Sequence, residues 1–267
     1  MPARPARVVR GRRCTLRAQA SAHRRALLPT PRNPVSQLPA LILAAGRGER
    51  MRPLTDEAPK PLLKVRGKPL IEWHLEALAR DGIREVVINT AWLEEQFPAV
   101  LGDGARWGLR IRYSMEGRDH GGALETAGAI ATARDWLGEA GDAFWVVSGD
   151  IWCPGFRFDP AQALAFARGD RLAHFFMVPN PAFHPRGDFA LDAQGLLRTE
   201  GEPRWTYANL GLYRLGLVEG LAGGLRAPLR PYMDRAIAAG RISGEVWRGA
   251  WENVGTPDQL AALDAAP

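Results

Sequence analysis

Short apolar runs alternate with stretches of helical periodicity from residue 39 onwards. Three apolar runs, over 41–43, 85–89 and 143–148, predict buried strands. A stretch of alternating apolar and polar residues over 109–114 predicts a half-buried strand. Apolar residues at helical spacing predict the helices between them, over 69–78, 92–101 and 124–137. This alternation of strands and helices is typical of an α/β fold, in which helices cover both faces of a mainly parallel sheet.

The second half of the chain is less regular. Further strands are predicted over 173–179, 188–191, 207–213 and 246–254. A helix is predicted over 229–239, with Gly240 just past its end, and a last helix starts with Thr256 as N-cap and Pro257 at its first position. We therefore expect residues 39–267 to form one domain, a three-layer α/β/α Rossmann-like fold with a mainly parallel, mixed sheet.

Residues 1–38 differ from this domain in composition. They contain nine arginines and no acidic residue, whereas the rest of the chain has 26 basic and 29 acidic side chains. We expect this basic segment to be disordered. It could be a transit peptide, a nucleic-acid-binding arm, or an upstream extension produced by start-site choice, and we favour the last or a merely disordered tail. A nucleic-acid partner for the domain itself loses its support.

Cysteine usage and hydropathy restrict the compartment. Cys14 and Cys153 lie far apart in sequence, without metal-ligand spacing or a disulfide framework, which favours a reducing, cytoplasmic location. No apolar run is long enough to cross a bilayer, so no membrane partner is expected. The pattern carries no signal for an oligomeric state.

The loop after the first predicted strand has the composition of a phosphate-binding loop. Small residues and glycines allow backbone N–H groups to approach a polyphosphate, at Ala44, Ala45, Gly46 and Gly48. Arg50 and Lys60 add positive charge beside that backbone. The chain has 32 arginines and three lysines, which indicates a specific need for the compact ammonium group of Lys60.

Two polar residues follow other predicted strands. Asn89 ends the strand 85–89, and Asp150 comes just after the strand 143–148. Ligands of parallel sheets bind outside the carboxyl ends of the strands, and a carboxylate there can hold Mg²⁺ against phosphate oxygens. For Asp150 the alternative is an N-cap or turn role.

Three motifs in this order resemble the signature of the sugar-1-phosphate nucleotidylyltransferases. They are LAAGRGERMRPLT with PKPL over 43–62, Gly149-Asp150, and WENVGTP over 251–257. Within that family, the stretches VINTAWL, LETAG and GRISGEVWRGAWENVGT resemble the subgroup that uridylylates N-acetylmuramic acid 1-phosphate in peptidoglycan recycling. The resemblance implies the nucleotide-diphospho-sugar transferase fold, UTP and a sugar 1-phosphate as small-molecule substrates, and Mg²⁺ as cofactor.

The resemblance also implies roles for residues around the reacting phosphates. The loop backbone would hold the phosphates, Arg50 would neutralise the leaving pyrophosphate, and Lys60 would stabilise charge in the transition state. Asp150 and Asn253 would coordinate Mg²⁺. The base and ribose would lie near Glu125, Thr126 and Gly128, with Asn89 also on the nucleotide side. Gly187, Asp188 and Asn209 would face the sugar, and for Asp188 a turn role is equally open.

Two departures from the family pattern bear on these roles. Position 253 is Asn where relatives often carry Asp, and a neutral oxygen is a weaker Mg²⁺ ligand. Ala129 stands where Gly is usual, close to the expected base contact. Two alternatives therefore stay open: a sibling enzyme for another sugar phosphate, such as glucose or mannose 1-phosphate with dTTP, UTP or GTP, and a regulatory homologue that binds nucleotide sugars without catalysis.

Overall fold

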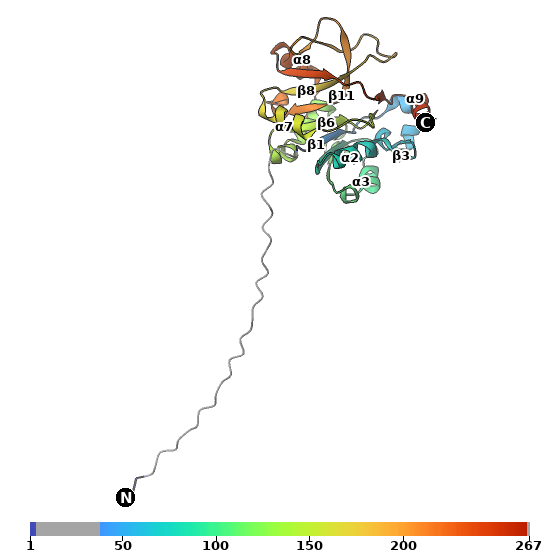
Figure 1. Cartoon of the computed structure of the whole chain (residues 1–267). Coiled ribbons are helices and arrows are strands. Elements are labelled where there is room, and N and C mark those ends of the chain that lie inside the picture. Colours follow the sequence, from blue (N-terminus) through green and yellow to red (C-terminus); the bar gives the residue numbers. More distant parts are fainter. Residues whose placement is uncertain (4–37, 266–267) are drawn as a thin grey trace. The chain divides into compact units, whose positions relative to one another are not determined.

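The computed structural model describes residues 1–3 and 38–265 (Figure 1), so the expected disordered segment over 1–38 lies almost wholly outside the described residues. The strands are β1 (Ala40–Leu43), β2 (Lys64–Val65), β3 (Lys68–Pro69), β4 (Glu85–Thr90), β5 (Arg110–Met115), β6 (Ala143–Ser148), β7 (Ile151–Trp152), β8 (Ala173–Val178), β9 (Phe189–Leu191), β10 (Leu197–Arg198), β11 (Arg204–Arg214), β12 (Ile242–Val246) and β13 (Glu252–Asn253). The α-helices are α1 (Leu54–Glu57), α2 (Leu70–Arg80), α3 (Gln96–Leu101), α4 (Glu116–His120), α5 (Glu125–Thr132), α6 (Arg134–Leu137), α7 (Pro160–Arg168), α8 (Arg230–Ala238) and α9 (Pro257–Ala265).

A parallel set of strands forms the centre of the main sheet. β6, β1, β4 and β5 lie side by side and parallel, with β1 between β4 and β6. The register places Leu43 beside both Asn89 and Ser148, so three strands end at the same level. The chain runs from β1 to β4 on one side and later reaches β6 on the other. This reversal makes the carboxyl ends of β1 and β6 a topological switch point, where open α/β sheets bind ligands.

The rest of the sheet is mixed, as expected. β11 pairs antiparallel with β6, β8 and β9, while β12 runs parallel to β8. The pairing of β11 with β8 shifts register between Tyr207 and Gly211. An irregularity of this kind bends a strand and redirects a side chain. It places Asn209, whose φ is 57°, at the bend.

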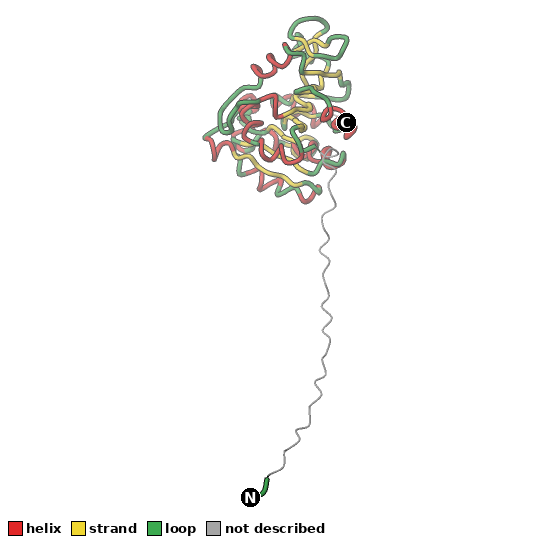
Figure 2. The backbone as a smooth tube through the Cα atoms, turned by 90° about the vertical axis from the view of Figure 1, so that its left-hand side faces the viewer, coloured by secondary structure: helices red, strands yellow, loops and turns green. Residues whose placement is uncertain are grey.

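Two apolar cores lie on opposite faces of the sheet and confirm the three-layer α/β/α arrangement. Alternate β1 residues face opposite ways: Ile42 packs with residues of α2, α3 and α7, and Leu41 packs with residues of α5, α6 and α8. Figure 2 shows helices beside the strands, and mostly strands and loops at one end. A third cluster joins Met51 and Trp152 to Val254 and Leu263 of the C-terminal segment.

Several boundaries differ from the sequence predictions. The strand predicted over 246–254 is wrong: β12 ends at Val246, and the later part is the two-residue β13. The pattern missed β12 because it contains Gly244, where a Cβ would lie 2.8 Å from Phe175 O; the glycine permits a close backbone approach. The helix expected over 124–137 breaks at Ala133, and that over 92–101 begins only at Gln96.

Three α-helices were not predicted: the short helices α1 and α4, and the nine-residue α7. α7 has an N-cap at Asp159, whose side chain accepts a hydrogen bond from Ala161 N at 2.8 Å, and Pro160 at its first position. This capping pattern is the signal that could have revealed it. The same reasoning succeeded for α9, where Thr256 Oγ1 accepts a hydrogen bond from Gln259 N at 3.3 Å.

Candidate functional site

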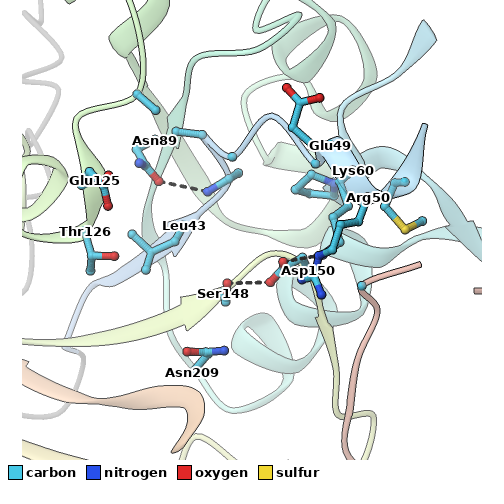
Figure 3. A pocket seen from close by; sticks show the side chains of 18 residues that line it. Leu43, Glu49, Arg50, Lys60, Asn89, Glu125, Thr126, Ser148, Asp150 and Asn209 are labelled. Atoms are coloured by element: carbon cyan, nitrogen blue, oxygen red, sulfur yellow. Dashed lines mark hydrogen bonds and ion pairs between the residues drawn. The ribbon is translucent and has the colours of Figure 1, made fainter. Parts of the chain in front are cut away.

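A cavity of about 540 Å³ lies at the carboxyl ends of β1, β4 and β6 (Figure 3). Figure 3 shows Glu125 and Thr126 on one side of it and Arg50, Lys60 and Asp150 on the other. The expected nucleotide-binding residues in its wall are Ala44, Ala45, Gly46, Gly48, Arg50, Lys60, Asn89, Glu125 and Thr126. Asn209 also lines this cavity, although it follows the glycine loop by more than 150 residues.

The glycine loop is fixed by its own side-chain packing. Gly48 has a φ of 68°, and a Cβ there would lie 3.0 Å from Thr55 Cγ2 and 3.2 Å from Lys60 Cβ, so only glycine fits without movement. Thr55 Oγ1 donates a hydrogen bond to Gly48 O at 2.9 Å. The N–H groups of Ala45, Gly46 and Gly48 have no hydrogen-bond partner within the described residues. They are the backbone donors that a bound phosphate could engage.

The two arginines of the loop have different surroundings. Arg47 lies over the Trp92 ring at 3.5 Å and donates to Thr55 O at 2.9 Å, so it braces the loop from outside the cavity wall. Arg50 does line the cavity. A Cβ on Gly255 would lie 3.3 Å from Arg50 Nη2, which places the C-terminal motif against the guanidinium group.

Lys60 and Asp150 form an ion pair in the cavity. Lys60 Nζ lies 2.6 Å from Asp150 Oδ2, and Ser148 Oγ donates to Asp150 Oδ1 at 2.7 Å. The Lys60 side chain is only 8% exposed, against 30% for Asp150. Gly149 sets the position of the carboxylate: its N–H donates to Leu43 O at 2.8 Å, and a Cβ there would lie 3.1 Å from the same oxygen. The strand end is therefore tied to the start of the glycine loop.

The third motif reaches Asp150 through a short strand pair. β13 pairs with β7, placing Asn253 opposite Ile151, and Val254 N donates to Asp150 O at 3.2 Å. The Asn253 Oδ1 atom is buried and has no hydrogen-bond partner in the part of the chain that the structure describes. Asn253 lines the second cavity and Asp150 the first, so the structure brings their backbones together but does not place both side chains in one wall. A buried, unpaired amide oxygen fits a hard cation such as Mg²⁺, which takes one or two protein oxygens and completes its shell with phosphate and water. Residues 1–3 and 38–265 hold no group of three or more His, Cys, Asp or Glu that could bind a metal without such phosphate ligands.

A buried polar network joins the ends of three strands, and the sequence reasoning missed its central member. Asn89 Oδ1 accepts a hydrogen bond from Ala44 N at 3.0 Å, and Asn89 Nδ2 donates to Glu116 Oε1 at 2.9 Å. Glu116 Oε2 accepts from Leu124 N at 2.8 Å. Burial raises the pKa of Glu116, although both donors oppose that shift. Its place after the strand ending at Met115 was the available signal. Asn89 thus lines the cavity and also fixes the loop.

The expected base-side residues are only partly brought together. Glu125 and Thr126 line the cavity, and Glu125 has a φ of 64°, which is costly for a residue with a side chain. Gly128 is buried within α5 outside this wall, and a Cβ there would lie 2.3 Å from Leu225 O. Ala129 is also fully buried. The methyl group at position 129 therefore packs in the core rather than in the cavity.

A second cavity, of about 360 Å³, shares Asn209 with the first. Asp188 and Asn253 line this second cavity. Gly187 is not in its wall: it packs against Asn180, whose Oδ1 would lie 2.6 Å from a Cβ added at Gly187. Asp188 Oδ2 accepts a hydrogen bond from Tyr207 N at 2.8 Å, so the carboxylate also holds a segment nineteen residues away, a structural role other than the turn role considered from the sequence. Aromatic and basic residues complete this wall, among them Phe183, His184 and Arg230, which the sequence did not single out, and Trp251, the first residue of the C-terminal motif.

Comparisons with known proteins agree with this geometry. Residues 39–186 match the model of the nucleotidyl transferase family. The chain is 44% identical over 229 residues to an N-acetylmuramate alpha-1-phosphate uridylyltransferase of Neisseria meningitidis, covering 85% of this chain and 96% of the relative. The chain is a nucleotidyl transferase.

Further relatives of this nucleotidyl transferase share the architecture. An N-acetylmuramate alpha-1-phosphate uridylyltransferase of Caulobacter vibrioides is 33% identical over 242 residues, covering 86% of this chain and 98% of its own length. The solved structure of a CTP:phosphocholine cytidylyltransferase from Streptococcus pneumoniae superposes with a TM-score of 0.64 at 18% identity, covering 85% of this chain and 98% of that one. This likeness confirms the nucleotide-diphospho-sugar transferase fold.

Buried His74, in contact with Ile151 of β7, predicts a loss of stability in acid. Its side chain is 2% exposed, Nε2 lies 2.9 Å from Ile151 O, and burial lowers its pKa to about 4. Between pH values of about 6.5 and 4, only the unfolded chain protonates this imidazole. Above that pH range, His74 is neutral in both states and its protonation has no effect on the free energy of unfolding. As the pH falls from 7 to 5, protonation of the unfolded chain lowers that free energy by about 2 kcal/mol.

Urea unfolding at pH 7 and pH 5 measures this effect. When the pH is lowered from 7 to 5, the free energy of unfolding of a His74→Gln variant is expected to decrease by about 2 kcal/mol less than that of the wild-type chain. His120→Gln, at an exposed histidine, should keep the wild-type decline. An undiminished decline in His74→Gln would assign the acid sensitivity to other groups.

Proposed function

We propose that this nucleotidyl transferase transfers the uridylyl group of UTP to N-acetylmuramic acid 1-phosphate, giving UDP-N-acetylmuramic acid and pyrophosphate. The observation that carries the proposal is the pair of cavities that share Asn209, with the Lys60–Asp150 ion pair in the wall of the larger one. One cavity suits a nucleoside triphosphate and the other a sugar. The substrates named for the two N-acetylmuramate relatives support the choice of sugar and base.

The protein's part in the reaction is positioning and charge stabilisation. A phosphate oxygen of the sugar substrate attacks the α-phosphorus of UTP in line, the bond to the β-phosphate oxygen breaks, and pyrophosphate leaves. The N–H groups of Ala45, Gly46 and Gly48 would hold the triphosphate, and Arg50 would neutralise charge on the departing pyrophosphate. Lys60, held within its largely buried slot, would stabilise the charge that develops at the α-phosphate.

Asp150 and Asn253 are the residues that would hold Mg²⁺. The paired carboxylate and the unpartnered amide oxygen of Asn253 suit a cation whose remaining ligands are phosphate oxygens and water. When bound, the ion would draw electron density from the phosphate oxygens and help to align them. Ser148 and Gly149 keep Asp150 aimed into the cavity.

The sugar would occupy the second cavity, and the uridine would lie beside Glu125 and Thr126. Asp188 and Asn209 line the wall of the second cavity, where the sugar is expected. Gly187 allows the turn of the chain before Asp188 but does not itself line that wall. We also propose a cytoplasmic enzyme of peptidoglycan recycling, since N-acetylmuramic acid is a cell-wall sugar. The free, buried Cys153, whose pKa burial raises to about 12, agrees with a reducing compartment. Among residues 1–3 and 38–265, no helix has the length and apolarity needed to traverse a membrane.

A coupled pyrophosphate-release assay tests this function. UTP, dTTP, GTP and CTP would each be combined with the 1-phosphates of N-acetylmuramic acid, N-acetylglucosamine, glucose and mannose in the presence of Mg²⁺. The expected result is the highest kcat/KM for UTP with N-acetylmuramic acid 1-phosphate. Preference for another pair would leave a sibling nucleotidyl transferase, and no release above background with any pair would leave a binding protein.

A further inference from the structure

We propose that Arg230 selects the sugar substrate by binding a carboxylate carried on its ring. This inference rests on the proposed function and names the group that the sugar cavity recognises. N-acetylmuramic acid differs from N-acetylglucosamine by a lactyl ether, whose carboxylate is negative at neutral pH. Neutral hexose and hexosamine phosphates have no charge at that point.

Arg230 is placed and oriented for such a contact. It is the first residue of α8, directly after the buried Leu229, and its side chain is 59% exposed where it lines the second cavity. Its Nε donates to Asp234 Oδ1 at 2.7 Å, one helical turn along, which fixes one edge of the guanidinium group. Within the described residues, Nη1 and Nη2 have no hydrogen-bond partner. A planar group held by one edge presents two parallel N–H donors at the other, the geometry that a carboxylate accepts.

The position of the reacting phosphate directs the rest of the sugar towards Arg230. The phosphate must approach Lys60 and Asp150 in the wall of the nucleotide cavity, and Asn209 is common to both walls. The sugar ring and its substituents then extend into the second cavity. Arg230 and Phe189 lie together there, with the guanidinium carbon of Arg230 5.3 Å from the centroid of the Phe189 ring.

Asp188, the acidic residue of the same wall, does not form an ion pair that would occupy Arg230. Asp188 accepts hydrogen bonds from Tyr207 N at 2.8 Å and lies 3.1 Å from His184 Nε2, so its carboxylate is engaged by other donors. No ion pair joins Asp188 to Arg230 among the described residues. The wall thus offers one arginine whose outer edge is available to a ligand, and an anionic ring substituent is the chemical group that fits it.

Steady-state kinetics with two substrates test this inference. The first substrate is N-acetylmuramic acid 1-phosphate, and the second is its analogue in which the lactyl carboxylate is a neutral carboxamide. Wild-type enzyme is expected to have a kcat/KM roughly 10- to 100-fold higher for the acid, mainly through KM. Arg230→Ala should lose that preference and use both substrates about equally, while its KM for UTP stays near the wild-type value.

Matched variants separate recognition from general damage. Arg235→Ala removes an exposed arginine of the same helix, and it should keep the wild-type preference for the acid. Arg230→Lys retains the charge without the fork, and should recover part of the preference. Equal use of acid and amide by wild-type enzyme, or an unchanged preference in Arg230→Ala, would overturn the role of Arg230 and leave the uridylyltransferase function intact. A wild-type enzyme inactive on N-acetylmuramic acid 1-phosphate would overturn both.

Discussion

Replacing Asp150 with alanine is expected to lower kcat at saturating substrates and Mg²⁺ by at least about 100-fold. Asp150 is the carboxylate that Lys60, Ser148 and the β7–β13 strand pair all position. Its loss removes the charged oxygen that we propose as a Mg²⁺ ligand and leaves the largely buried Lys60 without its anionic partner. The change should also raise the Mg²⁺ concentration needed for half-maximal rate. Pyrophosphate release across a Mg²⁺ titration measures both effects.

Two controls define what the Asp150 result means. Asp135→Ala removes an exposed aspartate of α6 and should leave kcat unchanged. Ser148→Ala removes only the hydrogen bond to Asp150 Oδ1, so a loss of less than about tenfold is expected. A turnover in Asp150→Ala that stayed near the wild-type value would place the metal elsewhere.

Replacing Lys60 with alanine is expected to lower kcat by about 100- to 1,000-fold, with a smaller change in the KM for UTP. The Lys60 side chain is only 8% exposed, so its charge is screened by solvent much less than that of a surface lysine. Lys60→Arg should not restore the rate. An arginine would place a wide planar fork where the compact ammonium group of Lys60 contacts Asp150 Oδ2 at 2.6 Å.

The lysine experiment has its own control and a test of coupling. Lys64→Ala, at an exposed lysine of β2, should turn over normally. Because Lys60 and Asp150 form one pair, the double variant Lys60→Ala with Asp150→Ala should be about as slow as the slower single variant rather than show the product of the two losses. Full activity in Lys60→Arg would show that charge alone suffices at this position.

The sequence predicted the parts of the site that depend on local chemistry. The strand before the glycine loop, the glycine with positive φ, and the aspartate after a buried strand each have a signature within a few residues. The capped start of α9 is of the same kind. Asn253 was proposed as a site residue through a motif, yet the pairing of its strand with the segment after Asp150 joins residues about a hundred positions apart. Such pairing depends on the packing of the whole domain and leaves no local pattern.

The missed residues share a physical reason. Glu116 is fully buried, so its role follows from where Asn89 and Leu124 lie after folding. Arg230 reads in sequence as one more surface arginine among 32, and only the cavity shows what it faces. Gly128 illustrates the converse: a glycine in a recognised motif can be required by a neighbouring carbonyl, here Leu225 O, rather than by a ligand.

The bend in β11 has a thermodynamic consequence. It gives Asn209 a left-handed backbone and sets one side chain into the walls of both cavities. A nucleotide that shifted this asparagine would alter the affinity for the sugar phosphate, and the sugar phosphate would then alter the affinity for the nucleotide by the same factor. One amide group would thereby make the two binding equilibria interdependent, without a moving domain between them.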